Sequence, residues 1–129
     1  MYIPEGFGTI TPYIFVNTAD AFSDFVATAF GGVERGRTTR PDGVIANLQM
    51  EVGTSMIMVS EATEQYPAMP AAYYLYVEDC DSVTNQAILA GGVLKMAVAD
   101  MSYGDRQSGV EDPFGNIWWI SQRLVHGPY

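Results

Sequence analysis

Cysteine and histidine, which often act as nucleophiles and metal ligands, occur only once each in this sequence of 129 residues. Cys80 is the only cysteine, so neither an intramolecular disulfide nor a thiolate metal cluster can form. His126 is the only histidine, which makes Ser-His-Asp and Cys-His arrangements hard to build. It lies in the stretch Leu124–Tyr129, which we expect to be a frayed end. We therefore expect no catalytic residue of these kinds and no histidine ligand.

The densest local motif is the run Tyr103–Ile120. Its segment Asp-Pro-Phe-Gly-Asn, residues 112 to 116, favours a tight turn because Pro fixes φ, Gly allows positive φ, and Asp and Asn can bond their own backbone. The β-branched and aromatic residues of Ile117–Ile120 then favour a strand. In such a strand Trp118 and Trp119 face opposite sides of the sheet.

The composition favours one acidic globular domain over residues 1 to 129. Lys and Arg number 6 against 15 Asp and Glu, so the net charge of −9 opposes binding to nucleic acid or to anionic membranes, although it would attract a cationic ligand. No apolar run reaches the roughly 18 residues of a membrane span. The first residues, Met1–Glu5, do not resemble a signal peptide, so we expect a cytoplasmic protein.

Hydrophobic periodicity predicts the order β-α-β-β-β in the first half of the chain. Its helix carries an apolar face that includes Phe22, Phe25 and Val26, and it ends at Gly31-Gly32. The predicted strands are Thr9–Val16, Val33–Thr39, Val44–Glu51 and Thr54–Ser60.

The same order returns after a polar, proline-bounded segment, residues 61 to 71, that suits a linker. Asp79 or Asp81 can cap the second helix, which ends at Gly91-Gly92. The predicted strands are Tyr73–Val77, Leu94–Met101, a short one near Gln107–Glu111, and Ile117–Leu124.

Matching landmarks in the two halves indicate an internal duplication. Gly31-Gly32-Val33 returns as Gly91-Gly92-Val93 at an offset of 60, and Val16 returns as Val77 at an offset of 61. We therefore divide the chain into a first βαβββ unit at 9 to 60, a linker at 61 to 71, and a second βαβββ unit at 72 to 124.

This duplication and the run from Tyr103 resemble the vicinal-oxygen-chelate superfamily, which includes glyoxalase I, bleomycin-resistance proteins and extradiol dioxygenases. The likeness is greatest to its PhnB-like branch, which carries Tyr-Gly-Asp-Arg and then Asp-Pro-Phe-Gly-Asn-x-Trp. The resemblance implies an α+β fold in which two curled mixed sheets form a barrel-like cavity with the helices outside. It also implies a two-fold homodimer.

Metal-using members of that superfamily take four ligands from the first and last strands of each unit. Counted from the strand-closing valines and the turn glycines, the resemblance places them at Thr11, Ile57, Ala72 and Trp119. Ala, Ile and Trp offer no donor atom, and a lone Thr hydroxyl is a weak ligand. We therefore expect no metal and no other cofactor.

Other charged residues have more ordinary interpretations. Glu51 and Glu61 stand near strand ends as stray carboxylates, where surface carboxylates are common. We expect Asp105 and Arg106 to form an ion pair that anchors the last hairpin, and Asp112 to be a turn residue.

Strand alternation predicts which side chains face the cavity. The resulting inner face is aromatic with a few polar tips, as a site for a flat or apolar small molecule requires. The opposite face, with Met56, Met58 and Trp118, should pack beneath the helices. We expect ligand contacts from Tyr13, Phe15, Ile57, Val59, Tyr74, Tyr76, Met101, Tyr103, Trp119 and Arg123.

The function expected from these features is binding without turnover. The chain would sequester a hydrophobic or aromatic compound, as bleomycin-resistance proteins do. One alternative is a lyase, isomerase or dioxygenase-type enzyme of the same superfamily with an atypical site, using an unforeseen carboxylate pair or acid–base chemistry by Glu61 or a tyrosine. The other is a chain that only dimerises, with rings that merely fill a small barrel.

Overall fold

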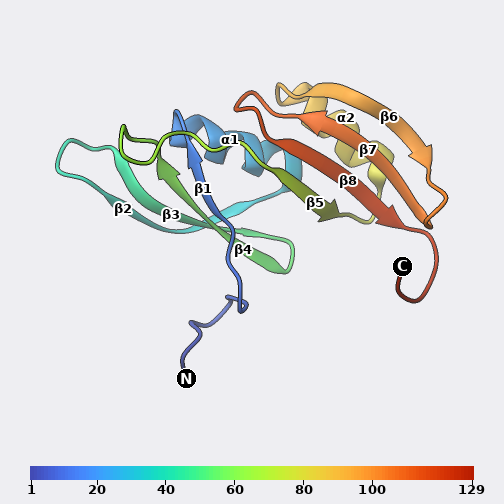
Figure 1. Cartoon of the computed structure of the whole chain (residues 1–129), viewed down its shortest axis with the longest axis horizontal. Coiled ribbons are helices and arrows are strands. Elements are labelled where there is room, and N and C mark those ends of the chain that lie inside the picture. The colour runs from blue at the N-terminus through green and yellow to red at the C-terminus, as the bar shows by residue number, and fades with distance from the viewer. The chain divides into compact units, whose positions relative to one another are not determined.

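Each half of the chain folds into a four-stranded mixed sheet that carries one helix on one of its faces. The computed structural model describes all residues from 1 to 129 and divides the chain into two units, residues 1 to 70 and 71 to 129. Figure 1 shows the β-α-β-β-β order of each unit. The predicted α+β fold with two βαβββ units is confirmed.

In the first unit the sheet order is β1-β4-β3-β2. β1 runs parallel to β4, while the other neighbours are antiparallel. α1 packs on β1, β3 and β4. The elements are β1 (Tyr13–Val16), α1 (Ala19–Phe30), β2 (Val33–Thr39), β3 (Ile45–Val52) and β4 (Ser55–Glu61).

The second unit repeats this plan with the sheet order β5-β8-β7-β6, in which β5 is parallel to β8. α2 packs on β6, β7 and β8. The elements are β5 (Ala72–Tyr76), α2 (Cys80–Leu89), β6 (Val93–Asp100), β7 (Asp105–Glu111) and β8 (Ile117–Arg123). Register shifts between β2 and β3 and between β6 and β7 mark bulges, which bend a sheet and increase its twist.

Some element bounds differ from the sequence prediction. β1 begins only at Tyr13, because Pro12 has no N–H to extend the ladder. β7 is a full seven-residue strand and not a short piece. Glu61, expected in the linker, closes β4.

The last strand of each unit also holds the first turn of that unit's helix. The Glu61 carboxylate accepts hydrogen bonds from the backbone N–H groups of Thr18 and Ala19, both at 2.8 Å. In the second unit, Gln122 Oε1 accepts from Cys80 N at 3.0 Å. Both contacts satisfy donors that a helix start leaves without an intrahelical partner.

The helix-facing side of each sheet is the hydrophobic core. In the second unit Trp118 and Ile120 are buried there, and the Cys80 thiol of α2 donates to the Ile120 carbonyl at 3.3 Å. Burial raises the pKa of Cys80. Neither helix has the length and apolar character that a transmembrane helix needs. The core of the first unit includes Ile14, Val16, Phe22, Val26, Leu48, Met50 and Val59.

The predicted turn between β7 and β8 is built around Asp112, which is 3% exposed. Its carboxylate accepts hydrogen bonds from the backbone N–H groups of Phe114 and Asn116, the Asn116 side-chain amide and the Trp118 indole, each at 2.9 Å. The prediction that Asp112 is a turn residue is confirmed. It also fixes the orientation of the Trp118 indole.

The corresponding turn of the first unit is one residue shorter. Gly53 and Thr54 join Val52 to its partner Ser55, whereas three residues, Pro113–Gly115, separate Asp112 from its partner. The turn glycine comes first in the shorter loop and last in the longer one. The same number of residues counted from the turn glycine therefore ends one residue too early in β4 compared with β8.

Candidate ligand-binding face on the second unit

The face of β5 to β8 opposite α2, hereafter the open face, gathers five of the ten residues predicted to contact a ligand. Because paired residues of neighbouring strands point the same way, the pairs Tyr74–Trp119 and Tyr76–Ser121 share this face. Tyr74 and Tyr76 remain 44% and 57% exposed, and Tyr103, just before β7, is 42% exposed. Three exposed tyrosines thus stand together on one side of the sheet.

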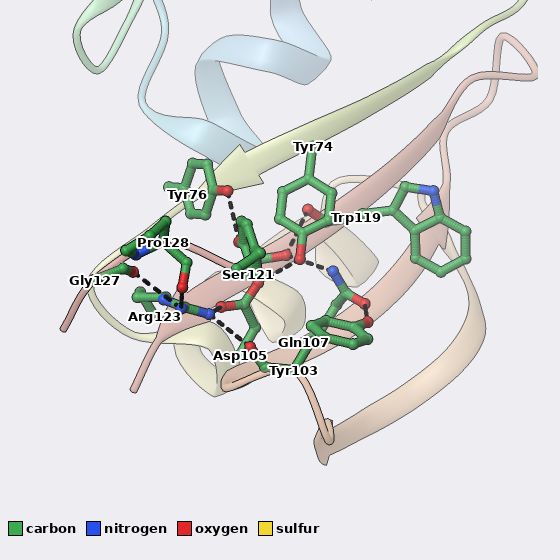
Figure 2. A network of polar contacts seen from close by, with 11 residues as sticks. Tyr74, Tyr76, Tyr103, Asp105, Gln107, Trp119, Ser121, Arg123, Gly127 and Pro128 are labelled. Atoms are coloured by element: carbon green, nitrogen blue, oxygen red, sulfur yellow. Dashed lines mark hydrogen bonds and ion pairs between the residues drawn. The ribbon is translucent and has the colours of Figure 1, made fainter. Parts of the chain in front are cut away.

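At the centre of these tyrosines lies a carboxylate, Asp105, with an exposure of 0% (Figure 2). It accepts hydrogen bonds from the Tyr74 hydroxyl, from the Tyr129 hydroxyl at 2.6 Å and from Arg123 Nη1 at 3.0 Å. Burial alone would raise the pKa of Asp105, but these three donors outweigh it, so its pKa lies below the ordinary value. Asp105 is therefore a carboxylate at neutral pH.

The two tyrosines bonded to Asp105 are neutral phenols at that pH. Burial, together with the hydrogen bond to Asp105, raises the pKa of Tyr74. The same two causes raise the pKa of Tyr129. Each hydroxyl therefore donates to a fixed negative charge, which makes the contact stronger than a hydrogen bond between neutral groups.

The predicted ion pair between Asp105 and Arg106 is wrong, because adjacent residues of β7 point to opposite faces. Arg106 lies on the helix side, where it bonds Asp81 at 3.0 Å and Asp100 at 2.8 Å. Asp105 bonds Arg123 across the open face instead. Each residue therefore has a partner of opposite charge, but on different sides of the sheet.

A second polar chain continues along the open face from Tyr103. Its hydroxyl donates to Gln107 Oε1, and the Gln107 amide donates to the Ser121 hydroxyl at 2.8 Å. Ser121 in turn donates to the Trp119 carbonyl at 3.1 Å. These bonds hold the Tyr103 ring and the Gln107 amide in place and leave the aromatic surface exposed.

The Trp119 indole lies over its cross-strand partner, Gly109, and takes up the space of the side chain that glycine lacks. A Cβ added at Gly109 would stand 2.7 Å from Cζ3 of the indole and 3.1 Å from Cε3, which is closer than packed carbon atoms approach. Only glycine allows this contact. The indole thus packs against the Gly109 backbone, and Trp119 is half-buried.

The segment Leu124–Tyr129, expected to be frayed, folds back onto the open face. Arg123 Nη2 donates to the carbonyls of Gly127 at 3.0 Å and Pro128 at 3.1 Å, and its guanidinium lies 4.3 Å from the centre of the Tyr129 ring. Arg123 Nη1 also donates to the Tyr103 carbonyl at 2.7 Å. Arg123 therefore joins this segment to the buried carboxylate.

The open face of the first unit is simpler, and its ion pair, between Arg35 and Glu51 at 3.0 Å, is exposed at the end of β3. Tyr13 pairs with Met58, and its ring centre lies 5.0 Å from that of Phe15, on which Tyr66 stacks at 5.8 Å. The Tyr13 hydroxyl accepts from Asn47 at 3.4 Å. Beside Met58 is a pocket of about 290 Å³ bounded by residues 2 to 11.

The prediction that Ile57 and Val59 share the open face with Tyr13 is wrong. Both are buried, and Val59 pairs with Ile14 on the helix side, whereas Met58 pairs with Tyr13. The physical cause is the shorter turn before β4, which shifts the register by one residue. In the second unit the prediction agrees with the structure: Trp118 is buried beneath α2, and Trp119 lies on the open face.

Comparison with known proteins places this fold in a family. Residues 6–120 match the model of the Glyoxalase/Bleomycin resistance protein/Dioxygenase superfamily. The chain belongs to this superfamily. A protein of Mycobacterium bovis described as uncharacterized is 29% identical over 124 residues, a match that covers 88% of this chain and 82% of the relative.

Solved structures share the superfamily fold. TioX from Micromonospora sp. ML1 superposes with a TM-score of 0.72 at 21% identity, covering 89% of this chain and 99% of the other. A putative 3-demethylubiquinone-9 3-methyltransferase, PhnB protein, from Bacillus cereus has a TM-score of 0.71 at 14% identity, covering 89% and 99%. At these identities the likeness shows the fold alone.

The four positions implied for metal ligands in this superfamily do not fit a divalent ion here. With the corrected register they are Thr11, Met58, Ala72 and Trp119. None offers an imidazole or a carboxylate, the donors that such ions prefer. No three His, Cys, Asp or Glu side chains gather elsewhere in the chain either.

Some residues of the open face were not predicted as ligand contacts. Asp105 and Gln107 could have been found by alternation along β7, since they share the face of Gly109. Tyr129 carried no such signal, because it follows a Gly-Pro pair outside any periodic element. Met101 is half-buried in the loop between β6 and β7, and its backbone N–H donates to the Asp105 carbonyl at 2.7 Å.

Proposed function

We propose that this chain binds a neutral aromatic small molecule on the open face of the second unit and does not convert it. The observation that carries the proposal is the group of exposed tyrosines held around a buried carboxylate, beside an indole that rests on Gly109. Exposed aromatic clusters usually mark binding surfaces. Rings fixed in advance also lose little conformational entropy when a ligand stacks on them.

The state of the polar groups supports binding over turnover. The only buried acid on the open face, Asp105, is engaged by three donors, and its lowered pKa makes it a poor general base. No buried side-chain nitrogen or oxygen lacks a hydrogen-bond partner. Sequestration of an aromatic compound, as in antibiotic resistance, is the biological role that we infer.

A finer placement in the PhnB-like branch is part of the same proposal. It is supported by the run from Tyr103 to Trp118 and by the fold likeness to the Bacillus cereus PhnB protein. We also propose a homodimer. In support, β6 is an edge strand that begins at the exposed Val93, and the exposed Leu89 ends α2 shortly before it. Light scattering should give about twice the chain mass of 14.1 kDa, and a monomer mass would contradict it.

The experiment is a titration of the protein with a panel of neutral aromatic compounds, followed by tryptophan fluorescence. Because Trp119 is the indole on the open face, quenching should persist in Trp118→Phe and disappear in Trp119→Phe. Trp119→Ala should lose roughly 2 to 4 kcal/mol of binding free energy, as aromatic hot spots do.

Met58→Ala is the matched control, because Met58 holds the equivalent place in the first unit. It should change the affinity by less than about threefold, which is under 1 kcal/mol. The proposal is overturned if no compound of the panel binds with a Kd below about 1 mM. Mass spectrometry that finds a product formed from the bound compound would overturn the absence of turnover.

A further inference from the structure

The Tyr129 side chain occupies a well-defined position on the open face. Its hydroxyl donates to Asp105 at 2.6 Å and lies 2.6 Å from the Tyr76 hydroxyl. Its ring faces the Arg123 guanidinium at 4.3 Å and meets the Tyr103 ring edge-on at 6.4 Å between centres. We call the place bounded by these four residues the phenol seat.

The phenol seat selects by chemistry as well as by shape. A buried carboxylate can only accept, so the group facing Asp105 must carry a hydrogen on oxygen or nitrogen. A phenolate or carboxylate would meet the charge of Asp105 in a chain whose net charge is −9. The Arg123 guanidinium favours an aromatic π-face on its other side. A flat ring with a neutral hydroxyl satisfies all of these conditions.

The segment that carries Tyr129 is exposed along its whole length. Tyr129 is 68% exposed in spite of its hydrogen bonds, and residues 124 to 128 are all exposed as well. Little apolar surface is therefore buried by this segment. Beyond the Leu124 N–H, which donates to the Gly104 carbonyl at 2.9 Å, its attachment depends on the contacts of Arg123 and on the Tyr129 hydroxyl. A ligand that makes the same contacts and also reaches Trp119 would compete with it.

We propose that the phenol seat is a binding site for a neutral phenol and that Tyr129 covers it in the free protein. This inference rests on the proposed function, since it names the ligand class for the same face. Binding then requires the segment Leu124–Tyr129 to leave the seat, so the free protein binds more weakly than one in which the seat is open.

The test uses 4-methylphenol, the side-chain analogue of tyrosine, and toluene, which has the same ring without the hydroxyl. Calorimetry or NMR titration should show 4-methylphenol binding to Tyr129→Gly roughly tenfold or more tightly than to the wild type, because the variant opens the seat. Toluene should bind Tyr129→Gly roughly tenfold more weakly than 4-methylphenol, since a hydrogen bond to a charged acceptor is lost.

Two further variants test the partners of the hydroxyl. In the Tyr129→Gly background, Asp105→Asn should weaken 4-methylphenol binding roughly tenfold. Tyr76→Phe, which removes only an exposed hydroxyl and should fold normally, should weaken it about threefold. Tyr129→Phe keeps the ring but loses the hydrogen bond to Asp105, so its affinity for 4-methylphenol should lie between those of the wild type and Tyr129→Gly.

The inference is overturned if toluene and 4-methylphenol bind Tyr129→Gly equally, or if Tyr129→Gly binds 4-methylphenol no better than the wild type. Such a result leaves the proposed function standing when other aromatic compounds still quench Trp119. The opposite result is also distinguishable. If Tyr129→Gly binds 4-methylphenol selectively but no compound of the panel binds the wild type, the phenol seat is supported and the proposed function is overturned.

Discussion

The two units share their strand order and helix position, yet their open faces differ in kind. The pair Tyr13 and Met58 of the first unit stands where Tyr74 and Trp119 stand in the second. In the first unit, β3 has no charged residue before Glu51, which bonds Arg35. The ion pair on the open face of the second unit differs in its burial, because the Asp105 side chain is fully buried whereas that of Glu51 is 41% exposed.

The contrast at one cross-strand pair is the most informative. Gln49 lies opposite Met58, whereas Gly109 lies opposite Trp119. The second unit lacks a side chain at this position, and the indole occupies the space. The helix-facing sides are constrained by packing against a helix in both units, so the open faces are where the two copies could become different. A duplicated fold can thus carry a specific site in one copy only.

The largest expected effects are those on the helix-facing sides, where the units should behave alike. Trp118→Ala should lower the free energy of unfolding by about 4 kcal/mol, and its counterpart Ile57→Ala by about 3 kcal/mol, because both remove buried side chains. Urea unfolding measures both. A loss below about 1.5 kcal/mol for either would mean that its side chain is not core.

Substitution of the turn aspartates should affect the stability of the two units to different extents. Asp112→Ala should cost about 3 kcal/mol, because it leaves buried donors, including the Trp118 indole, without an acceptor. Asp42→Ala in a turn of the first unit is the control, with a cost of about 0.5 kcal/mol, since Asp42 is exposed and accepts only from Val44 N. Equal costs for the two variants would contradict the role given to the buried turn.

Gly109→Ala tests the position of the indole. The added methyl should push the Trp119 ring off the sheet, lower stability by about 1 to 3 kcal/mol and change the Trp119 fluorescence. Gln49→Ala, at the equivalent place, should cost less than about 1 kcal/mol and leave the fluorescence unchanged. Gly109→Ala with unaltered fluorescence would show that the ring does not rest on this glycine.

The stability of the second unit should depend on acid through Asp105. Its pKa is lower in the folded than in the unfolded chain, so its contribution is complete above about pH 4, the ordinary Asp value, and is lost as the pH falls through the folded value. The difference in urea midpoint between pH 7 and pH 3 should therefore be smaller in Asp105→Asn than in the wild type. Asp81→Asn is the control, because it removes another carboxylate with a lowered pKa, on the helix side of the sheet, and shows how much one such group contributes.

The smallest effects should come from exchanging the groups that hold the two helix starts. Glu61→Gln should cost about 1 kcal/mol, because an amide has one acceptor oxygen where the carboxylate accepts from both Thr18 N and Ala19 N. Gln122→Glu should add about 0.5 kcal/mol, since a negative charge is favourable at a helix N-terminus. Thermal unfolding would resolve both, and a change of the same sign in the two variants would refute the comparison.

Much of this architecture was predictable from the sequence. Glycine pairs after each helix, alternating strands and the turn at Asp112 indicated two βαβββ units, because each signal is local and has a direct backbone cause. The sides taken by Trp118 and Trp119 followed from the same alternation. The prediction failed where the position of a residue had to be counted across a loop. The side taken by Ile57 depends on a turn that is one residue shorter than its counterpart.

The site was predictable only in its aromatic part. The tyrosines of β5 could be placed by alternation, but the partner of Asp105 could not, because Arg123 belongs to a different strand. Tyr129 approaches through the fold-back of an irregular segment, which has no periodicity to read. Long-range hydrogen bonds between side chains therefore decide the chemistry of this face, and no sequence pattern fixes them.

The single thiol of the chain gives the second unit a reporter of its own. Cys80 is fully buried between α2 and β8 and donates to the Ile120 carbonyl, so a thiol reagent cannot reach it in the closed fold. Under native conditions, the rate at which Cys80 is labelled measures how often α2 separates from its sheet. A phenol that binds the opposite side of that sheet should slow the labelling, with no mutation or attached dye required.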